Sequence, residues 1–307
     1  MSLDHTSPGM VQRNTLIHRL GRDRIASAGA VTVAVAVVAA VFAPVLAGLS
    51  GNDPYAYDLS ALDATGAPAG WGGGISAAHW FGVEPLTGRD LFSIVVHGAR
   101  TSLLVGVGAS VVAVMLGVLV GITAGYFGGW FDVAASRVID VLFGFPGLIF
   151  MIAVGAIAPA AFPRVLLLVL VIGFFGWPSI ARVVRGQTLA LRTQGYVRAS
   201  VALGAGPGHV LLRQILPGLT ATIVVFSTMS IPGTIGAEAA LSFLGVGVPP
   251  PTPSWGRSIG DAVTWFSTDP FYLLFPGVAL FVVTLAFNVF GDGLRDALDP
   301  RSSGLTR

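Results

Sequence analysis

Residues 195–217 read GYVRASVALGAGPGHVLLRQILP and separate two long apolar runs of the chain. Apolar and small residues recur at helical spacing from Tyr196 to Leu203, which predicts an amphipathic helix over Arg185–Leu203. The run GAGPG at 204–208 should end that helix sharply, because glycine and proline interrupt regular structure. A second short helix over 209–216 is then expected before Pro217 opens the next apolar run. The sequence therefore predicts two short helices joined at a glycine corner.

This corner has the composition of a docking surface for another protein. Its small residues would let a partner's surface approach closely: Ala199, Ala202, Gly204 and Ala205. A helix with the same amphipathic pattern can instead lie on lipid headgroups. The residues of this segment alone leave both interpretations open.

The composition indicates a protein that is solvated by a bilayer. Of 307 residues, 54% are hydrophobic and 10% are charged, whereas about a quarter of the residues in a soluble domain are charged. A membrane-spanning helix needs about 20 apolar residues. Six stretches meet that length, so we predict an all-α, polytopic membrane protein with spans near 26–48, 102–124, 138–158, 163–182, 218–243 and 271–291.

Arginine placement predicts how these spans are oriented. With both termini in the cytoplasm, 13 arginines fall in inner segments and 4 in outer segments, and basic residues favour the cytoplasmic side. The chain then divides into an inner N-terminal segment (1–25), an anchor helix with an outer segment (26–101), a five-span core (102–295) and an inner tail (296–307). The core contains the long inner loop 183–217. In an outer loop, PPPTP at 249–253 predicts a stiff, extended stretch.

Several chemistries are excluded by residue content. All 17 basic residues are arginine, and without lysine there is no G-x-x-x-x-G-K-[ST] phosphate-binding loop. Cysteine is absent, which excludes disulfides, thiolate metal sites and thiol nucleophiles. The five histidines lie outside the predicted spans, and no serine–histidine or paired-aspartate protease site is visible within them. We therefore expect no enzyme activity, cofactor, metal or nucleic-acid partner for this chain.

The fifth predicted span holds candidates for a pathway or gate: Pro232, Gly233, Glu238 and Ser242. Proline and glycine at 232–233 should loosen the helix. Glu238 lies near its outer end, where it either faces a pathway through the bilayer or braces the outer end of the helix beside Ser242. The spans show no buried relay of Asp, Glu and His, which disfavours proton coupling.

The second predicted span carries a repeat of small residues at Gly117, Gly121 and Gly125. This spacing places the three glycines on one face of a helix, where a neighbouring backbone can approach closely. The repeat predicts close helix packing, either within this chain or at a subunit interface.

The inner loop resembles the cytoplasmic signature of importer permeases of the ATP-binding-cassette class, a Glu-Ala-Ala…Gly…Leu-Pro pattern. Matching positions are occupied by Ala199, Gly204, Leu216 and Pro217. The family's glutamate falls on Arg198 and its second alanine on Ser200, so the resemblance does not imply a salt bridge through position 198. The glycine corner is retained.

Further stretches resemble one branch of that class, the C-type dipeptide and oligopeptide permeases. In chain order they are GRDLFS (88–93), GARTSL (98–103), GYFGGWFD (125–132), EAALSFLGVG (238–247), PTPSWG (251–256) and FNVFGDGLRDALDP (287–300). An ordered set of motifs over about 82–301 is far more specific than any one of them. The N-terminal part matches only in layout, as one anchor helix followed by an outer segment.

The resemblance implies a permease subunit of the bacterial plasma membrane that forms half of a pathway for dipeptides or oligopeptides. It would assemble with a second, B-type permease subunit, cytoplasmic ATPase subunits and an extracytoplasmic solute-binding protein. It implies coupling to the ATPase through Arg198, Ala199, Ser200, Leu203, Gly204, Ala205, Gly206, Leu216 and Pro217. The alternatives are an ion-coupled secondary transporter, or an importer of the same class for nickel chelates, glutathione or haem.

Overall fold

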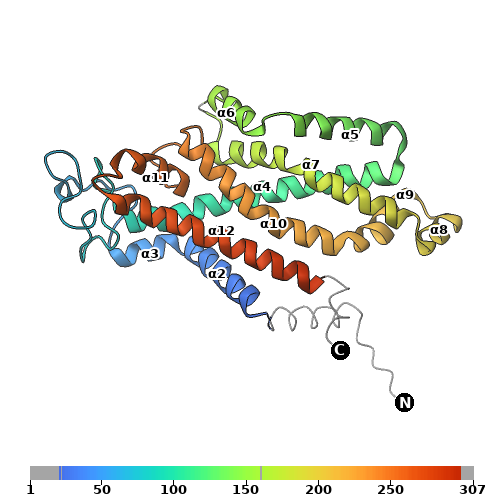
Figure 1. Ribbon diagram of the computed structural model, residues 1–307, viewed down its shortest axis with the longest axis horizontal. Coiled ribbons are helices and arrows are strands. Elements are labelled where there is room, and N and C mark those ends of the chain that lie inside the picture. Colours follow the sequence, from blue (N-terminus) through green and yellow to red (C-terminus); the bar gives the residue numbers. More distant parts are fainter. Residues whose placement is uncertain (1–20, 22, 160, 299–307) are drawn as a thin grey trace, which may run out of the picture.

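The computed structural model describes residues 21, 23–159 and 161–298, which form a bundle of helices joined by loops (Figure 1). The 1–20 and 299–307 segments, which hold most of the two predicted cytoplasmic ends, lie outside the described residues. One π-helical turn, η2, occupies Leu211–Ile215. The α-helices are α2 (Arg24–Val41), α3 (Ala43–Ser50), α4 (Leu91–Phe127), α5 (Gly129–Gly144), α6 (Gly147–Ile157), α7 (Arg164–Arg192), α8 (Gly195–Ala202), α9 (Pro207–Val210), α10 (Leu216–Phe243), α11 (Trp255–Ala262) and α12 (Pro270–Leu298).

The all-α membrane fold is confirmed, with a correction to one predicted span. In the described chain, five helices are long and apolar enough to cross a membrane: α2, α4, α7, α9 through α10, and α12. The span predicted at 138–158 is wrong as a single helix, because α5 and α6 meet at an angle of 85°. Pro146 explains the break, since proline disfavours helical backbone at the residue before it, and Phe145 is extended with ψ 136°. A sixth span exists only if this bent pair counts as one.

The repeat of small residues on α4 packs against α7 within the chain. A Cβ atom added to Gly117 would lie 3.0 Å from the Trp177 carbonyl oxygen, and one added to Gly121 would lie 2.7 Å from that of Ala181. A Cβ atom added to Gly125 would lie 2.9 Å from the Arg185 carbonyl oxygen on the same helix, α7. The prediction of close intrachain packing is confirmed.

The outer segment between α3 and α4 packs on the protein through a buried ion pair. Arg89 Nε lies 2.6 Å from Glu84 Oε2, and Tyr272 on α12 donates its hydroxyl to Glu84 Oε1 at 2.8 Å. Arg89 Nη1 also donates to the Pro251 carbonyl at 3.0 Å. Burial alone would raise the pKa of Glu84, but the Arg89 guanidinium outweighs it and holds that pKa below its ordinary value. The segment is thereby tied to α12 and to the loop before α11.

Two expectations for the outer side need correction. The prolines at 249–253 form a turn rather than an extended stretch, since the Thr252 N–H donates to the Pro249 carbonyl at 3.2 Å. The second span starts earlier than predicted, because the Asp90 carboxylate caps α4 by accepting the Ser93 N–H at 2.8 Å. The helix α11, which follows the proline turn, was not predicted. Trp255 at its start donates its indole N–H to the Val95 carbonyl at 2.9 Å, which fixes α11 against α4.

Candidate functional site

The inner loop 183–217 begins with a break that the helical pattern does not reveal. The single helix predicted over Arg185–Leu203 is wrong, because α7 ends at Arg192 and α8 begins at Gly195. Gln194 between them has extended backbone with ψ 145°. The Thr193 hydroxyl donates to the Ala190 carbonyl at 2.8 Å, a local bond that competes with the helical pattern. A turn therefore separates α8 from the wall helix α7.

Gly204 forms the predicted corner at the end of α8. Its φ is +88°, a conformation that glycine adopts without the penalty of a Cβ atom. The Gly204 N–H donates to the Val201 carbonyl at 3.0 Å, and the Ala205 N–H donates to the Ser200 carbonyl at 3.1 Å. These two bonds make a Schellman motif, which satisfies the last carbonyls of the helix.

The second short helix is continuous with the following span, which corrects the prediction of a separate helix ended by Pro217. From Pro207 the chain runs through α9 and η2 directly into α10. The Leu216 N–H bonds the Leu211 carbonyl, five residues back, as in a π-helix. A proline at 217 lacks an N–H and crowds the preceding turn, so one wider turn accommodates it without a break.

The segment from α8 to η2 is anchored by buried residues and presents an exposed apolar face. Val197 is 1% exposed and packs in one cluster with Val210 and Ile215. Leu203, by contrast, is 89% exposed, and Leu212 is 66% exposed. Figure 1 shows α8 and α9 at one end of the bundle, beyond the inner end of α12. A projection with uncovered apolar side chains can receive a partner protein.

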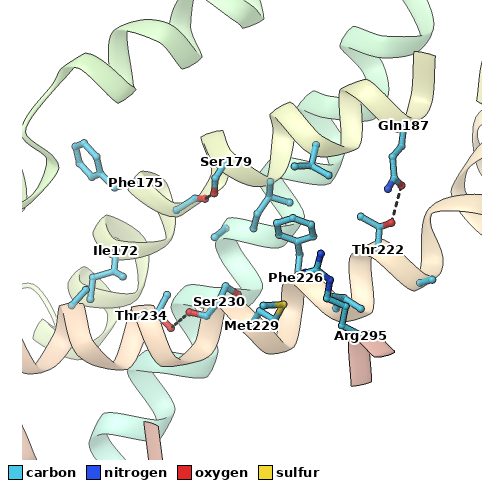
Figure 2. A pocket seen from close by; sticks show the side chains of 18 of the residues that line it. Ile172, Phe175, Ser179, Gln187, Thr222, Phe226, Met229, Ser230, Thr234 and Arg295 are labelled. Atoms are coloured by element: carbon cyan, nitrogen blue, oxygen red, sulfur yellow. Dashed lines mark hydrogen bonds between the residues drawn. The ribbon is translucent and has the colours of Figure 1, made fainter. Parts of the chain in front are cut away.

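A cavity of about 880 Å³ lies among α4, α6, α7, α10 and α12. Figure 2 shows its polar and aromatic side chains projecting from α7 and α10. This volume is within the roughly 300–1,000 Å³ typical of small-molecule sites. The lining residues are Ala113, Met151, Ile172, Phe175, Gly176, Ser179, Ile180, Val183, Gln187, Ala221, Thr222, Val225, Phe226, Met229, Ser230, Gly233, Thr234, Ala237, Arg295 and Leu298.

The polar side chains of the cavity wall come from three helices: Ser179 and Gln187 on α7, Thr222, Ser230 and Thr234 on α10, and Arg295 on α12. Thr222 on α10 donates its hydroxyl to Gln187 Oε1 on α7 at 2.7 Å (Figure 2). Arg295 reaches the cavity from the last turns of α12. Among the described residues that line the cavity, Arg295 alone carries a charged side chain. The wall therefore has a positive charge and no acidic partner for it.

Glu238 lies outside the cavity wall, in a buried hydrogen-bond cluster near the outer end of α10. It is 0% exposed and accepts the Ser102 hydroxyl from α4 at 2.7 Å. Ser242 and Ser254 donate to its other carboxylate oxygen at 2.7 Å and 2.8 Å. The carboxylate thus joins α4, α10 and the start of α11, which matches a bracing function rather than contact with cargo.

The structure gathers some of the predicted site residues and separates others. Of the pathway candidates, Gly233 lines the cavity, whereas Pro232, Glu238 and Ser242 are buried and do not. The coupling candidates cluster around the corner, most of them exposed: Arg198, Ala199, Leu203, Gly204, Gly206 and Pro217, with Ser200, Ala205 and Leu216 half-buried.

Four polar residues of the cavity wall were not predicted as site residues from the sequence: Ser179, Gln187, Thr222 and Arg295. A partial signal was available on α10, where polar side chains at 222, 230 and 234 interrupt an apolar span. The same span also holds Thr220, Ser227 and Thr228, so polarity alone does not select the face that lines the cavity. Which helices face one another across the cavity depends on tertiary packing.

Comparisons with known proteins agree with this architecture. A family model described as "Binding-protein-dependent transport system inner membrane component" matches residues 117–304. The glutathione transport system permease protein GsiD of Escherichia coli O1:K1 is 41% identical over 286 residues, which cover 93% of this chain and 89% of the relative. The protein of the same name from Shigella dysenteriae serotype 1 is 42% identical over the same coverage.

An all-helical protein with several candidate membrane spans, a cavity between them and an exposed helical corner at one end has the architecture expected of a membrane transport subunit. This chain belongs to the family of binding-protein-dependent transport system inner membrane components. It is a multi-pass inner-membrane permease of an ATP-binding-cassette importer, in the peptide branch of the C type, and is not itself the catalytic subunit. Membership of this family rules out the ion-coupled secondary transporter.

Proposed function

We propose that this chain forms half of the translocation pathway for glutathione or a closely similar short peptide, and that its inner loop receives the ATPase subunits. The observation that carries the proposal is the continuity of two helices. Both α7 and α10 line the cavity, and both run directly into the loop that holds the Gly204 corner. A movement at the corner is therefore delivered to two walls of the cavity.

Coupling requires that the helix bundle adopt two states, and that events at its inner and outer ends both shift the balance between these states. When the ATPase subunits close, they shift the exposed corner formed by α8 and α9. Val197, Val210 and Ile215 pack that corner against α7 and α10, so its displacement changes the separation of the two helices. A second permease subunit of the B type completes the pathway, and a solute-binding protein delivers cargo at the outer side.

Glutathione is better supported as cargo than the dipeptides and oligopeptides expected first. The two relatives described above are named as glutathione transport permeases, and each covers 93% of this chain. Glutathione was one of the alternative cargoes considered from the sequence. It is a tripeptide, so it belongs to the same chemical class as the first expectation.

The cargo assignment is tested with the complete importer in proteoliposomes that contain ATP on the ATPase side. We expect uptake of radiolabelled glutathione that depends on ATP and on the binding protein, and that unlabelled S-methylglutathione reduces. A simple dipeptide such as Ala-Ala at the same concentration should compete less. Uptake of the dipeptide with no uptake of glutathione would overturn the glutathione assignment and support dipeptides as the cargo.

A further inference from the structure

Most hydroxyl groups on the cavity wall are already committed to bonds within the protein. Ser179 donates to the Gly176 carbonyl at 3.1 Å, and Thr234 donates to the Gly106 carbonyl at 2.7 Å. The Thr222 hydroxyl is held by Gln187. These groups stabilise the helices, and they leave few donors for a cargo molecule.

Two donors at the inner end of the cavity remain available. Within the described residues, the Arg295 side chain makes no ion pair and no hydrogen bond, and the Gln187 side-chain nitrogen has no hydrogen-bond partner. Figure 2 shows the Arg295 side chain pointing from α12 toward the cavity. Asp292 stands one turn before it on α12 but does not line the cavity. The inner end therefore presents a guanidinium and an amide NH₂ together.

We propose that Arg295 is the specificity-determining residue that pairs with a carboxylate of the cargo, with the Gln187 amide as a second donor. The inference rests on the proposed function, in which this cavity is part of the peptide pathway. A guanidinium forms strong, charge-assisted bonds with a carboxylate, and its attraction grows where apolar walls such as Phe226 lower the local dielectric. A cation meets an unbalanced positive charge there, so the same residue selects against cationic cargo.

The absence of cysteine from the chain allows a direct test of this charge in the solubilised, assembled importer. Ala221 lines the inner part of the cavity and Ala237 lines it further along α10. Each is replaced by cysteine in turn, in separate chains. Labelling rates are compared for an anionic reagent, sulfonatoethyl methanethiosulfonate, and a cationic one, trimethylammonioethyl methanethiosulfonate. Parallel labelling of the cysteine-free chain accounts for cysteines in the partner subunits.

We expect Arg295→Gln to lower the anionic-to-cationic rate ratio at Ala221→Cys roughly tenfold. Arg295→Lys, which keeps the charge, should preserve the ratio. At Ala237→Cys, about 24 Å further along the helix at 1.5 Å per residue, the effect should be much smaller. Arg182→Gln is the matched control, because Arg182 pairs with Asp140 at 2.9 Å and does not line the cavity. A purely structural defect would change both reagents alike and at both positions.

Cargo protection then separates this inference from the glutathione assignment. S-methylglutathione has no free thiol to consume the reagents. It should slow labelling of Ala221→Cys in the chain that keeps Arg295, and much less in the chain that also carries Arg295→Gln. An unchanged rate ratio in Arg295→Gln would overturn the inference whatever the cargo is. A lowered ratio, with protection by another carboxylate-bearing peptide only, would support Arg295 as the selecting charge and overturn glutathione as the cargo.

Discussion

Thr222 Oγ1 lies 2.7 Å from Gln187 Oε1, and this hydrogen bond joins α10 to α7 where both helices leave the cavity for the inner loop. Within the described chain it is the side-chain hydrogen bond that links these two helices. Because a change in the separation of α7 and α10 must break or strain it, the bond favours the arrangement seen in this structure. We therefore expect it to act as a latch between α7 and α10 at the inner end of the cavity.

Thr222→Val should weaken that latch without changing the volume of the side chain. Loss of one partially buried hydrogen bond corresponds to about 1 kcal/mol. We expect the assembled importer to show a severalfold higher basal ATPase rate in the absence of cargo. Thr222→Ser, which keeps the hydroxyl, is the matched control and should stay near the native rate. Equal basal rates for the native chain and Thr222→Val would contradict the latch.

Gly121→Ala should destabilise the contact between α4 and α7. The added Cβ would lie 2.7 Å from the Ala181 carbonyl oxygen, so the backbones must separate. Overpacking of this kind costs about 1–3 kcal/mol. Gly236→Ala on α10 is the control, since nothing lies within 4 Å of its added Cβ. Thermal unfolding in detergent should show a lower midpoint for the first variant only, and equal midpoints would disprove the close contact.

Glu238→Ala should loosen the outer mouth, because it removes the acceptor of three buried serine hydroxyls. A hydrogen bond contributes about 0.5–1.5 kcal/mol, and each buried serine hydroxyl left without a partner costs about 1–3 kcal/mol. We expect a large drop in the unfolding midpoint and a smaller drop for Glu238→Gln, which retains a carbonyl acceptor. If the two variants were as stable as the native chain, the bracing function would be wrong.

The buried pair of Glu84 and Arg89 predicts a pH dependence of stability. The folded-state pKa of Glu84 is lowered from its ordinary value of 4.5, so the ionised carboxylate stabilises the fold fully above about pH 4.5. This stabilisation is lost as the pH falls through the lowered folded-state pKa, because Glu84 is then protonated in both the folded and the unfolded chain. At pH 7, the free energy of unfolding of the native chain should exceed that of Glu84→Gln by about 3 kcal/mol or more.

This difference should shrink toward zero as the buffer is acidified below the ordinary carboxyl range. Unfolding midpoints of the two chains, measured in parallel across pH, isolate Glu84 from the other titrating groups. A difference that is the same at pH 7 and at the acidic end would exclude an ionised Glu84 as its source.

The features that depend on local sequence could be predicted from it. Long apolar runs specify the spans, and the spacing of Gly117, Gly121 and Gly125 specifies the face of α4 that meets α7. The corner at Gly204 follows from its glycine-rich run, since positive φ is a local requirement. These elements need no knowledge of their neighbours.

Other features depend on backbone restrictions and tertiary contacts that local sequence patterns do not reveal. Pro146 lies in a run that is apolar enough to span, and only the backbone restriction at Phe145 bends it into α5 and α6. Conversely, Pro217 is typical of a helix boundary, yet the helix continues past it because the preceding turn, Leu211–Ile215, is π-helical. The pairing of Gln187 with Thr222 joins residues 35 positions apart, so it required the fold.

The central claim is that the Gly204 corner couples the ATPase to the cavity, and a bulky replacement there tests it most directly. A Cβ at this position meets nothing within 4 Å, but φ +88° is strained for any L side chain by about 1–2 kcal/mol. Gly208→Ala, within α9 and with an equally open Cβ position, is the matched control.

The measurement is cargo-stimulated ATPase activity of the purified, assembled complex, with subunit content checked in the same samples. For Gly204→Trp we predict loss of cargo stimulation and of transport, while Gly208→Ala behaves as the native chain. Normal transport-coupled ATPase activity in Gly204→Trp would contradict the account.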